Sequence, residues 1–147
     1  MSLRVTPMMY GDIASMTVQS EQVGVNKLVG TQYDEWLLKG GPAFTVRAEG
    51  EVIGCLGMVE QWEGRALVWA VLSEDARKHL LALTRVARAY LYTSPFRRIE
   101  AAVDAHFRMG CRWAHLLGFE LETPRPMPNY FANGNSAYLY AHVARST

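Results

Sequence analysis

The sequence predicts an α/β fold in which helices pack against a mixed sheet of antiparallel and parallel strands. Residues 44–48 alternate between apolar and polar side chains, and residues 52–59 and 66–72 are almost entirely apolar, as buried strands are. An amphipathic helical pattern then separates residues 66–72 from another apolar strand at 99–103. A helix that joins two strands of one sheet places them parallel, and this βαβ crossover makes the sheet mixed.

The chain has 147 residues, of which 50% are hydrophobic and 20% are charged. This length and balance are typical of one globular domain, and we expect a single domain over residues 1–147. The formal net charge of +1 gives no field that favours nucleic acid or an anionic membrane. We therefore expect neither of them as a partner.

The cysteine content and the apolar runs indicate the compartment. Cys55 and Cys111 are too few and too far apart for a disulfide framework, and we expect both as reduced thiols. Residues 1–10 lack a basic segment followed by an apolar stretch, and no run of about 18 apolar residues occurs. These observations predict a cytoplasmic protein without an export signal or a membrane span.

The first third of the chain is predicted to hold one short strand and two helices. Residues 3–6 have the composition of a strand, and Asp12 is the expected cap of a helix over about residues 13–20. A second helix is expected to begin near Thr31 and to end at the glycines before Pro42.

Three strands are predicted to follow. Residues 44–48 and 52–59 form the arms of a hairpin that turns at Glu49-Gly50. The sequence Trp62-Glu63-Gly64 then separates the second arm from residues 66–72. Three antiparallel strands are the simplest interpretation of this pattern.

The crossover helix is predicted over about residues 75–92. Ser73 is its expected cap, and Glu74 and Asp75 place negative charge in the first turn, where it suits the helix dipole. A further helix over about 107–117 ends at Gly118, which suits a left-handed cap. Extended structure is expected at 119–122 and in a last strand at 137–143.

The order of these elements is similar to that of the Gcn5-related N-acetyltransferase (GNAT) family over nearly the whole chain. The helix ending His115-Leu116-Leu117-Gly118-Phe119 also resembles the family's lysine, leucine, glycine, phenylalanine ending. The resemblance implies a GNAT-like fold and an enzyme that transfers the acetyl group of acetyl-CoA to an amine. Acetyl-CoA and an amine acceptor are then the expected partners.

The resemblance also implies where the coenzyme binds. In the family the two parallel strands, here 66–72 and 99–103, splay apart and accept the pantetheine arm, and N–H groups at the next helix start hold the pyrophosphate. The implied coenzyme-binding residues lie near the ends of these strands and in that helix start: Val71, Ser73, Ala76, Arg77, Lys78, His79 and Asp104.

The chain departs from the family pattern at the coenzyme loop and at two catalytic positions. Residues 73–79 contain no glycine, although glycine lets the backbone approach phosphates closely. Residues 66–72 hold no carboxylate to act as general base, and Ala114 stands where the family often has a tyrosine as general acid. Members without these groups exist, because positioning an amine beside a thioester supplies much of the rate.

Glu60 and His106 are the remaining catalytic candidates. Glu60 lies near the turn between the second and third strands and replaces the missing base if its carboxylate points into the cleft; a solvated turn is the alternative. His106 follows Asp104 just after strand 99–103, where family members contact the thioester. A strand-end cap or simple exposure is the alternative for both Asp104 and His106.

Cys111 and His115 lie one helical turn apart, a spacing that suits a metal ligand pair or a thiolate–imidazole pair. A free cysteine is more often buried as a small apolar group, and we favour that interpretation. We therefore predict no metal site.

Two other function classes stay open. The same missing groups, with Val71-Leu72-Ser73 leading into a basic helix, resemble GNAT-like internal virion proteins of short-tailed phages. That resemblance implies a non-catalytic protein of the virion or the host cytoplasm, with phage structural proteins as partners. The third class is a regulatory module that binds another small acyl or nucleotide ligand.

Overall fold

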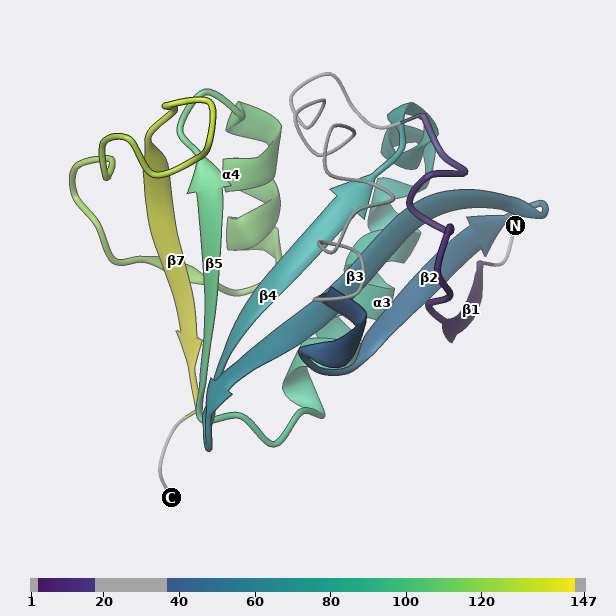
Figure 1. Cartoon of the computed structure of the whole chain (residues 1–147), viewed down its shortest axis with the longest axis horizontal. Coiled ribbons are helices and arrows are strands. Elements are labelled where there is room, and N and C mark those ends of the chain that lie inside the picture. Colours follow the sequence, from purple (N-terminus) through teal and green to yellow (C-terminus); the bar gives the residue numbers. More distant parts are fainter. Residues whose placement is uncertain (1–2, 18–36, 145–147) are drawn as a thin grey trace. The chain divides into compact units, whose positions relative to one another are not determined.

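The computed structural model describes residues 3–17 and 37–144 (Figure 1). In these residues seven strands form one mixed sheet, in the order β1-β2-β3-β4-β5-β7-β6. The strands are β1 (Arg4–Pro7), β2 (Ala43–Ala48), β3 (Glu51–Trp62), β4 (Arg65–Leu72), β5 (Arg98–Asp104), β6 (Glu120–Leu121) and β7 (Ala137–Val143). The helices that lie wholly within the described residues are the 3-10 helix η2 (Glu74–His79), α3 (Leu80–Tyr92) and α4 (Arg108–Leu116).

The structure confirms the predicted α/β class and most of the predicted strands. The segments at 44–48, 66–72, 99–103 and 137–143 correspond to β2, β4, β5 and β7, while β3 runs three residues beyond its predicted end. Strand β2 pairs with β3 in the antiparallel sense, and β4 pairs with β5 in the parallel sense. The pattern of apolar residues was therefore sufficient to define the mixed sheet.

The chain divides into two compact units. The first holds residues 1–59 and 68–86, and the second holds residues 60–67 and 87–147. Strands β3 and β4 and helix α3 each contribute residues to both units. The single domain over residues 1–147 stays a prediction.

The first unit has an apolar core on one side of its strands. Ile13, Leu37 and Cys55 are almost completely buried there, together with Val59 and Val71. The core therefore joins β3 and β4 to segments that lie far from them in the sequence.

The helix predicted at 13–20 is not found in its described part. Residues 10–15 form hydrogen-bonded turns instead, and residues 18–20 lie outside the described residues. Asp12, the expected cap, uses its carboxylate for other contacts: it accepts hydrogen bonds from the Met9 N–H at 2.8 Å and from the Thr45 hydroxyl at 2.7 Å. It also pairs with Arg47 at 3.3 Å, so tertiary contacts replace the local cap.

The predicted helix from Thr31 lies mostly outside the described residues. Residues 37–39 are helical, and Leu37 is 1% exposed. The described end of this helix therefore contributes to the core of the first unit.

Gly57 on β3 makes room for an indole ring. A Cβ at this position would lie 2.7 Å from the Trp69 ring and 2.9 Å from the carbonyl oxygen of Pro42. The carbonyl belongs to the backbone and already accepts the Met58 N–H, so it has little freedom to move. Gly54, on the same strand, faces a movable Leu72 methyl group instead.

We predict that Gly57→Ala lowers the free energy of unfolding by about 2 kcal/mol, because the new methyl group overpacks a fixed site. Urea unfolding followed by circular dichroism measures the change. Gly54→Ala is the matched control and is expected to cost less, since a leucine side chain can rotate away. Equal losses for the two variants would contradict this explanation.

The second unit is built on β5, β7 and α4. Strands β5 and β7 pair in the antiparallel sense from Arg98 with Val143 to Asp104 with Ala137, and α4 packs beside β5 (Figure 1). The helix predicted at 107–117 is confirmed as α4, within one residue at each end. Gly118 follows it with φ +95°, which confirms the predicted left-handed cap.

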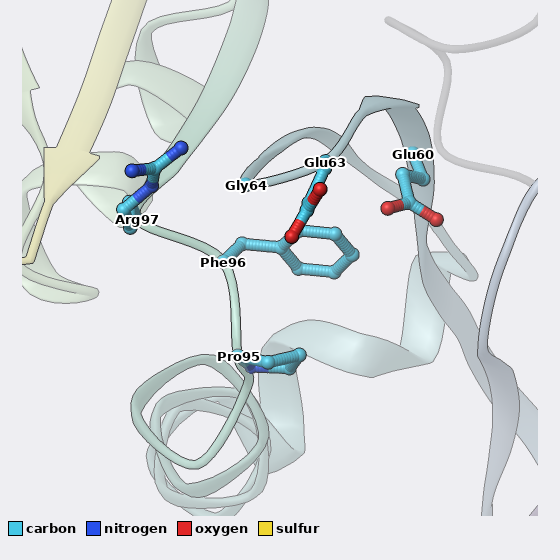
Figure 2. Close-up of a pocket in the computed structure, with 6 residues that line it drawn as sticks. All are labelled: Glu60, Glu63, Gly64, Pro95, Phe96 and Arg97. Atoms are coloured by element: carbon cyan, nitrogen blue, oxygen red, sulfur yellow. The ribbon is translucent and has the colours of Figure 1, made fainter.

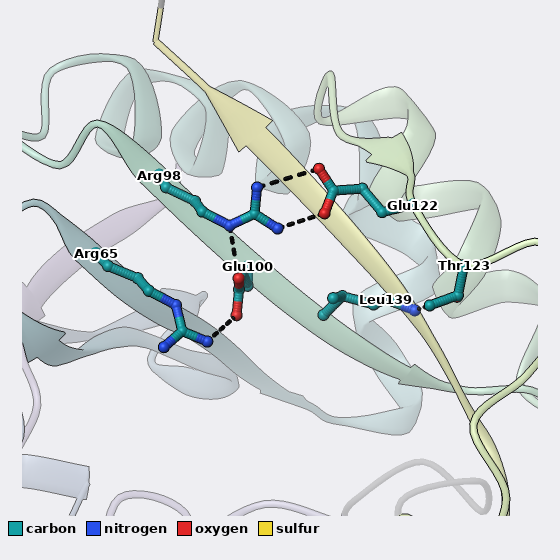
Figure 3. A network of polar contacts seen from close by, with 6 residues as sticks. All are labelled: Arg65, Arg98, Glu100, Glu122, Thr123 and Leu139. Carbon is teal, nitrogen blue, oxygen red and sulfur yellow. Dashed lines mark hydrogen bonds and ion pairs between the residues drawn. The ribbon is translucent and has the colours of Figure 1, made fainter.

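A buried carboxylate links three segments of the second unit (Figure 3). Glu100 on β5 is 5% exposed and accepts hydrogen bonds from Arg65 on β4 and from Arg98, each at 2.6 Å. Arg98 also makes a two-bond contact with Glu122, one bond of which measures 3.1 Å. The hydrogen bond from Arg65 is the main reason that the pKa of Glu100 lies below its usual value of 4.5. The contact with Glu122 is the main reason that the pKa of Arg98 is raised.

The lowered pKa of Glu100 predicts how stability depends on pH. A depressed carboxyl pKa adds stability above the unfolded value, and this contribution is lost as the pH falls through the folded value. Glu100→Gln should therefore lower the free energy of unfolding by about 2 kcal/mol at pH 7, and this difference should shrink toward about pH 3. Urea titrations at both pH values measure it, with the exposed Glu120→Gln as control. A difference that does not change with pH would contradict the prediction.

Candidate functional site

The predicted helix start after β4 has a different local structure from the one expected. The single α-helix predicted from about residue 75 is wrong in its first turns, because residues 74–79 form the 3-10 helix η2 and α3 begins at Leu80. Ser73 precedes η2 with φ −75° and ψ 166°, but its hydroxyl makes no capping hydrogen bond. Its N–H donates to the carbonyl oxygen of Ile53 at 2.9 Å, so Ser73 continues the extended chain of β4 and is held inside the unit.

The backbone N–H groups that the resemblance assigns to the pyrophosphate donate hydrogen bonds within η2. Ala76 is fully buried, and its N–H donates to the carbonyl oxygen of Ser73 at 3.1 Å. In a 3-10 helix each later N–H bonds to the carbonyl three residues earlier. This pattern also engages the backbone N–H groups of Arg77, Lys78 and His79. Lys78 also pairs with Asp75 at 3.4 Å. Any anion at this turn would therefore meet the exposed side chains of residues 77–78 before it met the backbone.

Two buried polar atoms on the β4 segment have no hydrogen-bond partner among the described residues: the hydroxyl oxygen of Ser73 and the indole nitrogen of Trp69. Successive side chains of a strand alternate between faces, so residues 69, 71 and 73 share one face. Val71, the implied coenzyme residue between them, is 3% exposed and belongs to the core of the first unit. A buried hydroxyl without a partner costs free energy that a bound ligand can recover. The coenzyme-binding role that the resemblance implies for Ser73 stays a prediction.

Asp104 acts as a cap at the end of β5. Its carboxylate accepts the His106 N–H at 2.9 Å and the side-chain amide of Asn135 at 2.7 Å. The His106 side chain is exposed. This geometry corresponds to the alternative interpretation of both residues, and the binding roles of Asp104 and His106 stay predictions.

Glu60 lines a pocket of about 410 Å³ in the second unit, together with Glu63, Gly64, Pro95, Phe96 and Arg97 (Figure 2). The pocket is formed by the turn between β3 and β4 and by the loop that follows α3. This turn begins β4, whereas Val71 and Ser73 stand at the other end of that strand. The sequence analysis pointed to Glu60 but not to the loop residues 95–97, because only the fold brings that loop to the β3–β4 turn.

The cleft that the resemblance implies is not tested by the strand pairing. The registered parallel pairs join residues 65–67 of β4 to residues 98–100 of β5. The remaining residues of β4 belong to the first unit and those of β5 to the second. The cleft therefore stays a prediction.

A cysteine, a histidine and a tyrosine gather where α4 meets β7. Cys111 contacts the Tyr140 hydroxyl, and its sulfur lies 3.9 Å from the carbonyl oxygen of Asp104. The His115 ring packs edge-on against the Tyr140 ring, with 5.2 Å between centroids. Burial, with a smaller contribution from Cys111, raises the pKa of Tyr140 to about 12. The sequence showed the Cys111–His115 spacing but not Tyr140, because only the β5–β7 pairing brings β7 to this helix.

In the part of the chain that the structure describes, no three histidine, cysteine or acidic side chains gather closely enough to hold a metal ion. Among the same residues, no helix combines the length and the hydropathy that a membrane span requires. Ala114, at the family's tyrosine position, is 4% exposed within the second unit.

Comparisons with known proteins identify the fold. No family model matches the sequence, and no curated protein does. Among solved structures, a candidate phosphinothricin N-acetyltransferase is similar with TM-score 0.74 and 12% identity, over 99% of this chain and 100% of its own. A GNAT-family acetyltransferase from Bacillus anthracis is similar with TM-score 0.72 and 15% identity, over 96% and 94%. A spermidine N-acetyltransferase chimera from Vibrio cholerae has TM-score 0.66 and 16% identity, over 96% and 95%.

These similarities confirm the GNAT fold that the order of elements predicted. At identities of 12% to 16% they show the fold alone. The narrower resemblance to phage virion proteins draws no support from them.

The unpartnered hydroxyl of Ser73 predicts an unusual result for its removal. We expect Ser73→Ala to leave the free energy of unfolding unchanged or to raise it by up to about 1 kcal/mol, because a buried donor without a partner disappears. Ser94→Ala is the matched control, since the Ser94 hydroxyl donates to the Leu91 carbonyl at 2.9 Å, and it should lower stability slightly. Chemical denaturation of both variants provides the comparison, and a clear loss for Ser73→Ala would show that the hydroxyl has a partner.

Proposed function

We propose that this protein is an acetyl-CoA-dependent N-acetyltransferase that acetylates an amine in the cytoplasm. The observation that carries the proposal is the buried Ser73 hydroxyl at the end of β4, which has no hydrogen-bond partner in residues 3–17 and 37–144, in a chain with the GNAT fold. In that fold the resemblance assigns this segment to the coenzyme. Acetyl-CoA is a substrate of the reaction, and no metal is required by it.

Each coenzyme-binding residue named from the sequence has its own proposed role. Val71 and Ser73 would line the pantetheine arm, with the Ser73 hydroxyl available as a donor or an acceptor. Arg77, Lys78 and His79 would supply positive charge to the phosphates through their side chains, since the N–H of Ala76 is already bonded. Asp104, which holds the loop after β5, is the remaining residue that the resemblance assigns to the coenzyme.

The proposed reaction is a direct attack. The amine nitrogen forms a bond to the thioester carbonyl carbon, the carbon–sulfur bond breaks, and the coenzyme leaves as a thiolate that takes up a proton. The nitrogen loses a proton to a base, for which Glu60 and His106 are the candidates. Because β4 carries no carboxylate, most of the acceleration would come from holding the amine beside the thioester.

Thermal unfolding in the presence of acetyl-CoA tests the binding step. A ligand at about a hundred times its dissociation constant adds about 2.7 kcal/mol of stability, which raises the melting temperature by several degrees in a protein of this size. We expect this rise with acetyl-CoA and a smaller one with ATP at the same concentration. Ser73→Ala should reduce the rise with acetyl-CoA, and Ser94→Ala should not.

No rise at saturating acetyl-CoA would contradict the proposal. The non-catalytic alternative, with virion proteins as partners, would then be the one to pursue. A rise with acetyl-CoA justifies a screen of amine acceptors, in which acetylated product is detected by mass spectrometry.

A further inference from the structure

Backbone hydrogen bonds hold together the two walls of the pocket, which are the β3–β4 turn and the loop after α3. The carbonyl oxygen of Gly64 accepts two hydrogen bonds, from the N–H of Arg97 at 2.9 Å and from the N–H of Arg98 at 3.0 Å. The carbonyl of Arg97 in turn accepts the Ala144 N–H at 2.8 Å. The two walls are therefore tied together by the backbone, and the volume of about 410 Å³ falls in the range of small-molecule sites.

Two carboxylates face this pocket and have no ion pair recorded among the described residues. Figure 2 shows the Glu63 carboxylate above the ring of Phe96, and the Glu60 carboxylate directed toward the same space. Glu100, by contrast, is paired with two arginines. The pocket therefore presents two carboxylates, against the single guanidinium of Arg97 among its lining residues.

Neither of the two arginines nearest to the pocket is paired with Glu60 or Glu63 in the part of the chain that the structure describes. Arg65 pairs with Glu100 and lies over the Trp62 ring, 4.4 Å from its centroid. The guanidinium of Arg97 lies against Gly64, with two nitrogens 2.8 Å from where a Cβ would stand, and points away from the Phe96 ring in Figure 2. Neither arginine reaches across the pocket to Glu60.

Phe96 supplies an aromatic surface below the carboxylates. Its ring lies between Pro95 and Glu63 in Figure 2, so apolar and acidic groups meet in one small volume. The face of an aromatic ring attracts a cation, and a carboxylate attracts it more strongly. An alkylammonium group satisfies both, because its charged end suits the carboxylates and its methylene groups suit Phe96 and Pro95.

The geometry points to a binding site for a primary alkylammonium group in this pocket, with Glu60 and Glu63 as its anionic contacts and Phe96 as its aromatic contact. The group belongs either to a free small amine or to a lysine side chain of another protein. The site lies at the beginning of β4. Amine binding to it is tested in the absence of acetyl-CoA, so that the two ligands are measured separately.

Titration of the whole protein with 1,4-diaminobutane tests the site, followed by amide resonances in two-dimensional NMR. We expect saturable shifts of the Gly64, Phe96 and Arg97 amides at millimolar concentrations. A peptide with one lysine provides the second arm, and its acetylated form and 1,4-butanediol are the uncharged controls. Shifts with the diamine alone assign the site to free amines, and shifts with the peptide alone assign it to lysine side chains.

The double variant Glu60→Gln, Glu63→Gln should weaken binding about tenfold, since it removes both charges. Phe96→Leu should weaken it about threefold, because it removes the aromatic face and keeps the volume. The matched control is Glu51→Gln, Glu120→Gln, which changes the net charge equally at exposed carboxylates outside the pocket and should bind as the native protein does.

Three outcomes would overturn the inference: no shifts with either amine, shifts spread over the whole surface, or equal weakening by the control variant. A failure here is separable from a failure of the proposed function, because acetyl-CoA binding is measured without the amine.

Discussion

The second unit depends on one buried carboxylate that neutralises two arginines. Parallel pairing places Arg65 of β4 directly opposite Arg98 of β5, and like charges opposite each other destabilise a sheet. Glu100 follows Arg98 by two residues, so it lies on the same face of β5 and accepts a hydrogen bond from each arginine. Glu122 compensates the rest of the Arg98 charge. The parallel pairing of β4 with β5 brings Arg65 and Arg98 together, and Glu100 between them offsets the repulsion of their charges.

The same network determines the charge of the neighbouring turn. Arg65 lies two residues after Glu63 in the sequence, and the structure gives it other partners. The fold gives it Glu100 and the Trp62 ring instead, and these contacts hold its guanidinium in the sheet. Glu60 and Glu63 therefore face the pocket without an ion pair to Arg65. An interaction that stabilises the sheet thus creates an acidic surface in the adjoining turn.

Local patterns predicted the strands well because each strand buries a run of apolar residues. They also predicted the helix end at Gly118, because the left-handed φ at that position favours glycine. They failed where a polar side chain had a choice of partners. Asp12 and Ser73 both have the composition of helix caps, but Asp12 bonds to Thr45 and the Ser73 backbone bonds to Ile53, more than 15 residues away in each case. The sequence named candidate site residues by their type and their place along the chain. It did not predict which side chains surround them, because those neighbours come from contacts between distant segments.

The absence of the family's general acid follows from packing and limits the chemistry that the proposed enzyme can use. Ala114 is buried on α4, and its carbonyl accepts the Phe119 N–H in the turn that closes the helix, so a tyrosine ring there would overpack the unit. Tyr140 contacts the same helix, but its pKa of about 12 makes it a weak proton donor near neutral pH. A thiol resembling that of cysteine has a pKa of about 8.5, so a departing thiolate needs little protonation. The loss of an acid therefore costs this reaction less than the loss of a base, and the critical requirement is an amine that reaches the thioester unprotonated.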